Sequence, residues 1–285
     1  MLMESKESNE SIFCESESDI LTRVMVCPPA FMKIEEAINE TQKHFLDENI
    51  DQEKAMEQHK KFIQTLHYYG ADVIQLPPIK RFPEQVFTRD IGFTIGDTVY
   101  VSHMGTEMRS GEEMVLVDWL NEMGINHDKI DTHAIEGGDV IIDGSTIWVG
   151  ISQRTTIEAI AELQQKLPTH DVIAVPFDSQ YLHLDCLFNV ISSTEALIYL
   201  KAFSKETIEQ FASHYSLIEV NEDEQFTMGP NVLSLGDKNV LSLPVNIELN
   251  ERLRKAGYHV IELDISEIIK SGGSFRCCSL PIKRA

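Results

Sequence analysis

The chain has 285 residues, which is enough for one large domain or two small ones with a sizeable core. Hydrophobic residues make up 42% and charged residues 25%, as in an ordinary globular protein, and the formal net charge is -22. A polyanion is repelled by phosphate backbones, so we expect no nucleic-acid partner. The acidic surface either keeps the protein in solution or draws a small cationic molecule toward a cleft.

The sequence shows no sign of a membrane or secreted protein. The longest stretch without a polar side chain, residues 24–32, is too short to span a bilayer, and the first twenty residues lack the apolar core of a signal peptide. We therefore expect no membrane partner and a cytoplasmic location. The five cysteines are an odd number without CxxC spacing, which argues against a disulfide framework and against a zinc site. We expect no cofactor and no metal, and a homo-oligomer remains open.

The first elements of the chain are irregular. Residues 1–19 are polar and acidic, which predicts a flexible N-terminal segment. Residues 20–26 predict a strand that ends at Cys27-Pro28-Pro29. Residues 50–69 have the periodicity of an amphipathic helix, which stops at Gly70, and residues 72–76 predict a further strand.

A repeat follows. Asp90, Asp139, Asp185 and Asn231 each open an apolar strand, a polar turn and a second strand, at intervals of 139 − 90 = 49, 185 − 139 = 46 and 231 − 185 = 46 residues. A helical stretch follows in each unit. Closing strands are predicted at residues 172–175, 217–220 and 258–263, and less clearly at 129–134. The strand, helix and strand before residue 77 supply a fifth, less regular unit.

Five such units cannot each bury their own apolar faces. Arranged around an axis they can, so the sequence predicts one α/β domain over residues 20–285, a five-bladed propeller of ββαβ units with pseudo-five-fold symmetry. Residues at equivalent repeat positions would then meet near the axis. The alternative is an ordinary α/β sandwich in which the spacing is coincidental.

The C-terminal sequence SGGSFRCC has the features of a loop that presents a thiol. Gly272 and Gly273 allow backbone turns that other residues disfavour, and they precede Cys277 and Cys278. A cysteine needs a base or a favourable electrostatic environment before it can attack an electrophile. Taken alone, the pair is as consistent with two inert core cysteines.

Three further motifs carry titratable side chains. In HLD, strand alternation would place His183 and Asp185 on one face, and a histidine can act as acid and base near neutral pH. In IEGGD, Glu136 precedes two glycines, which leave room for its carboxylate in a crowded centre. In VFTRD, Asp90 opens the first clear unit. Each motif alone is also consistent with a solvent-facing strand end or turn.

Together, a thiol, a histidine and several carboxylates at related repeat positions can surround a flat cation. A guanidinium offers five N–H donors in one plane and pairs with carboxylates through two hydrogen bonds. The sequence therefore favours chemistry on a guanidinium carbon, which needs a strong soft nucleophile and proton delivery to the departing nitrogen.

The ordered motifs VFTRD, IEGGD, HLD and GGSFRC resemble those of the guanidine-modifying enzyme (pentein) superfamily, over residues 21–284. The superfamily includes arginine deiminases, dimethylarginine dimethylaminohydrolases and glycine amidinotransferases. The resemblance implies a five-bladed α/β propeller that acts on a small arginine-like cation without a cofactor.

The resemblance also implies roles for individual residues. Cys277 would be the nucleophile and His183 the proton shuttle, and Glu136 would complete the charged group around the histidine. Asp90 and Asp185 would hold the guanidinium nitrogens. Arginines that bind the substrate carboxylate in relatives match Arg109 and Arg154, nineteen and eighteen residues after Asp90 and Glu136 (109 − 90 = 19, 154 − 136 = 18).

Several alternatives stay open at this point. A loop shifted by one residue would make Cys278 the nucleophile. The expected reaction is hydrolysis of arginine or an N-methylated arginine to citrulline, with ammonia or a methylamine released. The alternatives are an amidinotransferase, in which an amine replaces water, and a non-catalytic binding protein of the same fold.

Overall fold

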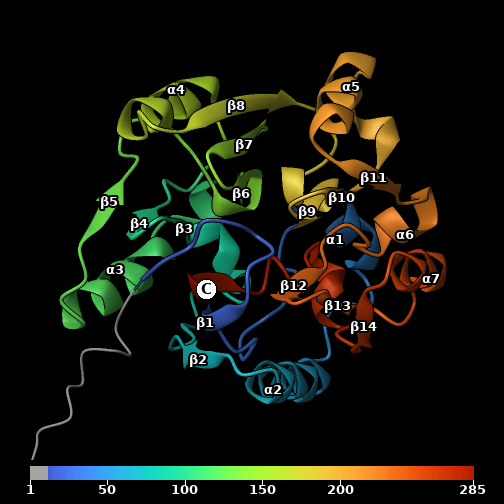
Figure 1. Cartoon of the computed structure of the whole chain (residues 1–285). Coiled ribbons are helices and arrows are strands. Elements are labelled where there is room, and N and C mark those ends of the chain that lie inside the picture. The colour runs from blue at the N-terminus through green and yellow to red at the C-terminus, as the bar shows by residue number, and fades with distance from the viewer. Residues whose placement is uncertain (1–11) are drawn as a thin grey trace, which may run out of the picture.

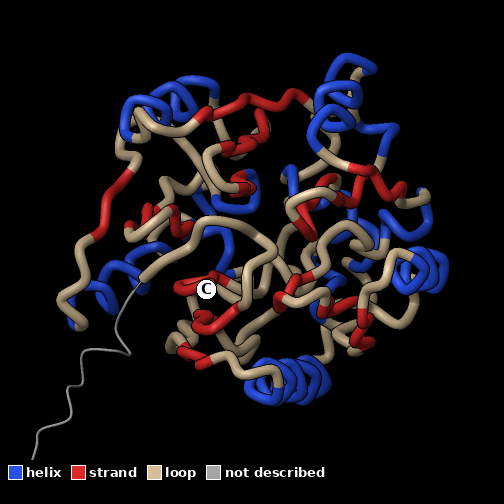
Figure 2. The backbone as a smooth tube through the Cα atoms, in the orientation of Figure 1, coloured by secondary structure: helices blue, strands red, loops and turns tan. Residues whose placement is uncertain are grey.

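The computed structural model describes residues 12–285 (Figure 1). Within these residues, five three-stranded sheets form blades around a central axis, and the longer helices lie on the outside (Figure 2). The predicted propeller of five ββαβ units is confirmed, and the alternative of a two-layer sandwich is wrong. None of the helices in residues 12–285 is both long enough and apolar enough to cross a membrane.

Four blades are continuous in sequence and share one topology. In each, two antiparallel strands are followed by a helix and a third strand that runs parallel to the second. The blades comprise β3 (Gly92–Ile95), β4 (Thr98–Val101), α3 (Glu113–Glu122) and β5 (His127–Lys129); β6 (Val140–Asp143), β7 (Thr146–Ile151), α4 (Ile157–Lys166) and β8 (Asp171–Pro176); β9 (Phe188–Ser192), β10 (Glu195–Ile198), α5 (Lys205–His214) and β11 (Ser216–Glu219); β12 (Leu233–Gly236), β13 (Asn239–Ser242), α7 (Ile247–Lys255) and β14 (His259–Glu262).

The third strand of the first of these blades lies earlier than predicted. Residues 129–134 were expected to form it, whereas β5 covers His127–Lys129. All three residues of β5 are polar and half-buried, so the strand lacks the apolar pattern that marks the third strands of the other blades.

The fifth blade joins the two ends of the described chain. It contains β1 (Leu21–Val26) and β2 (Asp72–Gln75), with α1 (Glu40–Phe45) and α2 (Gln52–Tyr68) between them. Its remaining strand is β15 (Leu280–Arg284), which pairs antiparallel with β1 and places Met25 opposite Leu280. The last strand therefore completes the unit that the sequence left without a first strand, and it closes the ring.

The core is shared between neighbouring blades. Trp148 of β7 is fully buried and packs edge-on against Phe211 of α5, whose ring stacks on Phe188 of β9 with 3.8 Å between centroids. Burying a side chain of this size contributes about 1.5–3 kcal/mol. Much of this contact lies between blades, which explains why a single blade would not be stable alone.

A short 3₁₀ helix precedes the first strand in three blades. These helices are η2 (Thr88–Ile91), η4 (Gly137–Asp139) and η5 (Leu184–Cys186), and they carry Asp90, Asp139 and Asp185. The prediction that HLD continues a strand is wrong, because His183 caps η5 and the helical turn sends His183 and Asp185 in different directions. Asn231 occupies the equivalent position just before β12.

Residues 12–19, here called the N-terminal strap, run across the blades (Figure 1). They lie at the ends of β3 and β6 that are opposite to the 3₁₀ helices η2 and η4. Cys14 exchanges backbone hydrogen bonds with Gly96, in the β3–β4 turn, and the Gly144 N–H, in the β6–β7 turn, donates to the carbonyl of Glu15. Residues 1–11 of the predicted flexible segment lie outside the described residues. Residues 12–19, in contrast, are held to the blades because their backbone groups pair with those turns.

Candidate active site

The loop that carries Cys277 is fixed by glycines and by one asparagine. It follows η7 (Ile268–Ser271), which ends at Gly272 with φ = +91°, a left-handed conformation that favours glycine. A Cβ atom on Gly273 would lie 2.5 Å from the Phe87 ring, so this position also requires glycine. The side-chain oxygen of Asn231 accepts hydrogen bonds from the backbone N–H groups of Ser274 and Cys277, both at 3.1 Å.

The sulfur of Cys277 lies against the carboxylate of Asp185. Its Sγ atom is 3.5 Å from Oδ2 and 3.8 Å from Oδ1. Arg276 donates from Nη1 to the same Oδ2 atom at 2.7 Å, and both residues of this ion pair are fully buried. Cys186 lies on the other side, with its Sγ atom 3.6 Å from Oδ1. Asp185 therefore contacts the sulfur of Cys277, and its negative charge is balanced by Arg276.

Cys278 occupies a different environment. Its side chain is fully buried and lines none of the cavities described below, and burial raises its pKa well above the usual value of a thiol. Cys277, in contrast, lines a cavity together with His183 and Asp90. The geometry thus distinguishes the two cysteines and favours Cys277 as the reactive one.

His183 lies between two carboxylates. Its Nε2 atom is 2.8 Å from Oε2 of Glu136, and its Nδ1 atom is 3.7 Å from Oδ1 of Asp90. Burial alone would lower the pKa of His183, but the negative charges of Asp90, Asp139 and Glu136 outweigh it and raise the pKa to about 10. The imidazole is therefore held as a cation at neutral pH, ready to donate a proton.

The two glycines of IEGGD allow the blades to approach closely at this point. A Cβ atom on Gly137 would lie 2.1 Å from the carbonyl oxygen of Arg89. A Cβ atom on Gly138 would lie 2.7 Å from both Oδ1 of Asp90 and Nδ1 of His183. The interpretation that these glycines make room for charged side chains therefore agrees with the geometry.

Asp90 offers one free oxygen to the cavity. Its Oδ2 atom is paired with Nη1 of Arg109, whereas its buried Oδ1 atom has no hydrogen-bond partner among the described residues. The other donors of Arg109 are directed at Glu112 and at the backbone carbonyls of Glu84 and Phe87. Arg109 was expected to bind a substrate carboxylate, but its contacts show that it holds Asp90 in place.

Arg154 is placed differently from Arg109. Its Nη1 atom is 3.3 Å from Oε1 of Glu136, and its side chain lines both the inner cavity and a larger outer pocket. Of the two predicted arginines, Arg154 is the one whose guanidinium can reach a ligand in that outer pocket.

Two contributors were not among the predicted site residues, although they were recognised as unit starts. Asp139 accepts hydrogen bonds from the Leu184 N–H at 2.9 Å and from the Ser152 hydroxyl at 2.6 Å, and its charge helps to keep His183 protonated. Asn231 holds the Cys277 loop, as described above. The repeat position was the signal that identified both residues.

The inner cavity is closed in this conformation. Its volume is about 10 Å³, room for about one water molecule. Ile38, Asn39 and Leu182 line both this cavity and the outer pocket beyond it, so they separate the two. Asn39 is fastened by its side-chain amide to the carbonyl of Ser271 at 2.9 Å. The cavity in this conformation is too small to hold a guanidinium.

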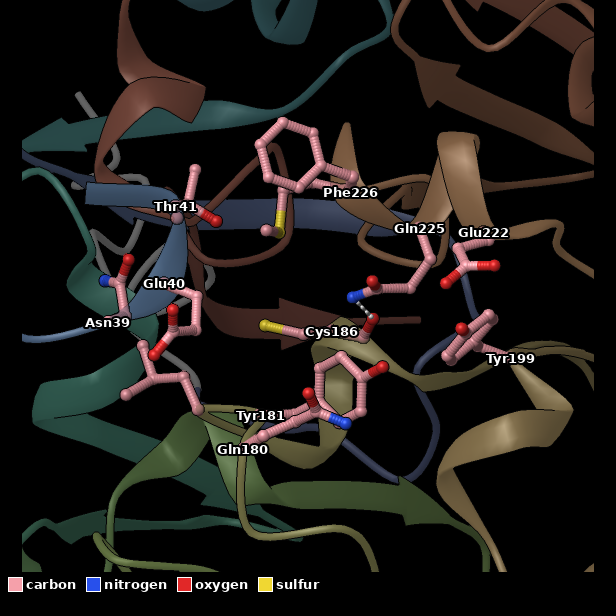
Figure 3. Close-up of a pocket in the computed structure, with 13 residues that line it drawn as sticks. Asn39, Glu40, Thr41, Gln180, Tyr181, Cys186, Tyr199, Glu222, Gln225 and Phe226 are labelled. Atoms are coloured by element: carbon pink, nitrogen blue, oxygen red, sulfur yellow. Dashed lines mark hydrogen bonds between the residues drawn. The ribbon is translucent and has the colours of Figure 1, made fainter. Parts of the chain in front are cut away.

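Two outer pockets meet at the residues that cover the inner cavity, and Glu40 and Tyr181 line both of them. The first, of about 400 Å³, contains the cationic side chains of Arg154 and Lys43. The second, of about 220 Å³, is shown in Figure 3 with aromatic and acidic side chains that include Tyr181, Phe226 and Glu40. Lys43 and Glu40 form an ion pair with each other, so Arg154 is the cation of the first pocket that lies beside the inner cavity.

The cluster of ligating side chains also bears on metal binding. Asp185, Cys186 and Cys277 bring possible ligand atoms within 4.8 Å of one another, and so do Asp90, Glu136 and His183. In each group an arginine is already paired with a carboxylate, so the protein itself supplies the positive charge. The prediction that no metal is needed remains a prediction.

The sequence matches the model of one known protein family over most of its length. The model of the family described as N,N dimethylarginine dimethylhydrolase, eukaryotic, matches residues 28–284. The chain belongs to this family. Within the superfamily of guanidine-modifying enzymes, the dimethylarginine dimethylhydrolase family shares the five-bladed fold seen here.

The chain is similar to three proteins that carry different names. The uncharacterized protein YkgA of Bacillus subtilis is 49% identical over 278 residues, which is 98% of this chain and 97% of that protein. The N(G),N(G)-dimethylarginine dimethylaminohydrolase of Mycobacterium tuberculosis is 30% identical and covers 91% of this chain and 85% of its own. The N-terminal domain of ArgZ, covalently bound to a reaction intermediate, superposes with a TM-score of 0.84 at 27% identity, covering 92% and 98% of the two chains.

Proposed function

We propose that this protein hydrolyses a C–N bond of the guanidinium group of arginine or an N-methylated arginine, with Cys277 as the nucleophile. The observation that carries the proposal is the cavity that Cys277, His183 and Asp90 line together, with one buried oxygen of Asp90 that accepts no hydrogen bond and lies 3.7 Å from Nδ1 of His183. A buried carboxylate oxygen without a hydrogen bond costs stability unless a ligand donates one, and a guanidinium is a suitable donor.

The first half of the proposed reaction forms a covalent intermediate. Asp90 holds the guanidinium, and the Cys277 thiolate attacks its central carbon to form a C–S bond. His183, as an imidazolium, donates its proton to the departing nitrogen while the C–N bond breaks, and the amine leaves. The remaining S-alkylthiouronium is bound to the enzyme. The covalent intermediate in the structure of ArgZ supports this route.

The second half releases the product. His183 is now neutral and accepts a proton from a water molecule, whose oxygen attacks the thiouronium carbon. The C–S bond breaks, the thiolate of Cys277 is restored, the remaining hydroxyl proton passes to solvent, and a ureido product such as citrulline leaves. Glu136 stabilises the imidazolium through the 2.8 Å contact with Nε2. Asp185 was expected to hold the guanidinium, but its Oδ2 atom lies 3.5 Å from Sγ of Cys277 and is paired with Arg276. We propose that it contacts the nucleophile.

The group of the substrate that lies away from the guanidinium determines which guanidino compound the protein uses. We propose that Arg154 binds the α-carboxylate, because it lines both the inner cavity and the larger outer pocket. This assignment favours arginine or methylarginine over a compound without a carboxylate, such as agmatine.

A product assay tests the function. The protein is incubated with arginine, monomethylarginine, dimethylarginine and agmatine, and the ureido product and the released amine are both measured. ArgZ is named an arginine dihydrolase, so ammonia per arginine is counted to separate one hydrolysis from two. A parallel reaction with an added amine acceptor detects amidino transfer. No turnover of any guanidino substrate would contradict the proposal.

A labelling experiment tests the nucleophile separately from turnover. A haloacetamidine that resembles the substrate should alkylate the wild type and the Cys278→Ala variant, but not Cys277→Ala, as located by mass spectrometry. The opposite pattern would show that Cys278 is the reactive thiol.

A further inference from the structure

The N-terminal strap places one carboxylate inside the propeller. Glu17 is 5% exposed, although its neighbours Glu15 and Asp19 are exposed. Its backbone N–H donates to the Ile142 carbonyl of β6 at 3.0 Å, which fixes the strap and directs the side chain toward the axis. The strap lies at the end of β3 and β6 that is opposite to η2 and η4. Glu17 therefore enters the axis from the side opposite to the substrate cavity.

Glu17 is connected to the nucleophile by three contacts. Its Oε1 atom accepts a hydrogen bond from Nη2 of Arg276 at 2.9 Å. Arg276 donates from Nη1 to Oδ2 of Asp185 at 2.7 Å, and that same oxygen lies 3.5 Å from Sγ of Cys277. All four side chains are buried. The chain of contacts runs along the axis from the strap to the reactive sulfur.

The charges along this chain are fixed. Burial would raise the pKa of Glu17, but Arg276, Arg89 and Arg284 together lower it to about 2, so Glu17 is an anion. Burial disfavours the charged form of Arg276, but Glu17 and Asp185 outweigh it and keep the guanidinium protonated. The positive charge of Arg276 is thus divided between two carboxylates, one on each side.

We propose that Glu17 is a positioning residue for the nucleophile, holding Arg276 against Asp185 while offsetting part of its positive charge. The inference rests on the proposed role of Cys277. The family model begins at residue 28, so the strap and Glu17 lie outside the part of the chain that it matches. A residue outside the matched part of the fold would then adjust the electrostatic environment of the sulfur.

Other ionisable groups also face Cys277. They are Asp185 and Cys186 from η5, Asp90 from η2, His183 just before η5, Glu84, Arg109 and Arg154, which line the same cavity, and Arg276 and Cys278 in its own loop. All of them remain in a Glu17→Gln variant, which removes one charge and keeps an oxygen that can accept from Arg276. A change in the reactivity of Cys277 in that variant therefore reports the charge of Glu17.

The experiment measures the rate of Cys277 alkylation by iodoacetamide between pH 5 and 10, with the labelled residue identified by mass spectrometry. Without Glu17, Arg276 presents more positive charge to Asp185 and the sulfur, so the thiolate should form more readily. A unit charge removed roughly 10 Å away in an interior with an effective dielectric constant of about 20 shifts a titration by about one pH unit. The midpoint in Glu17→Gln should therefore move down by about that amount.

Two controls make the result decisive. Glu15→Gln removes the same charge from the exposed side of the strap, and its midpoint should equal that of the wild type. Glu17→Asp keeps the charge and moves it by only one methylene group, so its midpoint should stay close to that of the wild type. If Glu17→Gln does not fold, as judged by thermal unfolding, Glu17→Asn, which removes the same charge from a shorter side chain, decides the question.

An unchanged or raised midpoint in the folded variant that removes the Glu17 charge overturns the inference, whatever its loss of stability. Alkylation needs no turnover, so this outcome is distinct from a failure of the proposed hydrolase activity, which the product assay detects.

Discussion

The Nε2 atom of His183 lies 2.8 Å from Oε2 of Glu136, and this contact joins residues from two different blades. Burial would raise the pKa of Glu136, but the hydrogen bond and charge of His183, together with Arg154 and Arg109, lower it. The pKa of His183 is raised in return. The pair is therefore an ion pair at neutral pH, and its two members set the pH range over which a proton can be donated.

Replacing Glu136 by glutamine should move the alkaline limit of activity to lower pH. In the wild type, the imidazolium of the free enzyme loses its proton near pH 10, so kcat/KM should decline only above about that pH. Without the carboxylate, one stabilising charge is absent and the decline should begin earlier. The measurement is a pH profile of kcat/KM for both proteins. Coincident alkaline limits would exclude Glu136 as the group that holds the proton on His183.

The same histidine should make stability depend on pH. Its pKa is raised from 6.5 to about 10 by folding, so the imidazolium stabilises the folded protein fully below about pH 6.5, and this contribution is lost as the pH rises through about 10. The Tm difference between the wild type and His183→Asn should therefore be largest near pH 6 and shrink toward pH 10. A difference that grows with pH would contradict the assignment.

Arg154 and Arg109 should respond differently to substitution by glutamine. Arg154→Gln should raise KM for arginine by about tenfold or more, because a charged hydrogen bond contributes about 1.5–3 kcal/mol, and it should affect agmatine much less. Arg109→Gln should lower activity toward both compounds and reduce Tm, because it leaves Asp90 and Glu112 buried without their cation. Steady-state kinetics with both substrates and thermal unfolding provide the comparison. Equal effects of Arg154→Gln on both substrates would remove the proposed carboxylate contact.

Gly138→Ala should impair catalysis without unfolding the protein. The added methyl group would lie 2.7 Å from Asp90 and His183, so these side chains must shift, and displacements of this order cost at least about tenfold in kcat. Gly144→Ala is the control, because a Cβ atom there meets nothing within 4 Å and the cost is strain at φ = +59°. The control should lose stability and keep its activity per folded molecule. Full activity in Gly138→Ala would show that the space around His183 is wider than described.

The repeat allowed much of the site to be predicted. The spacing of Asp90, Asp139, Asp185 and Asn231 identified four residues that meet near the axis, because equivalent positions in a propeller converge. The glycines after Glu136 likewise predicted room for a carboxylate in a crowded centre, and those before Cys277 predicted backbone turns. These features depend on local sequence and on the period of the repeat, which a single chain contains.

Other features depend on tertiary contacts that no sequence pattern marks. The N-terminal strap pairs through its backbone, so its Ser- and Glu-rich side chains resemble those of a flexible segment. The contact between Glu17 and Arg276 joins residues 259 positions apart. For Arg109, the side chain alone does not distinguish a substrate ligand from the partner of a buried acid. Glu112, three residues after Arg109, is the local signal in the sequence that indicates an ion pair.

Because β15 pairs with β1, the sulfur of Cys277 lies on the segment that closes the ring. A ribosome that has translated only to residue 276 has made every other group described in the cavity, including His183, Glu136 and Asp90, but neither the thiol nor the closing strand. Reactivity and the final blade are therefore acquired together, after the other four blades have been synthesised. An unfinished or prematurely terminated chain of that length could bind a cation at most, and it could not form the covalent intermediate.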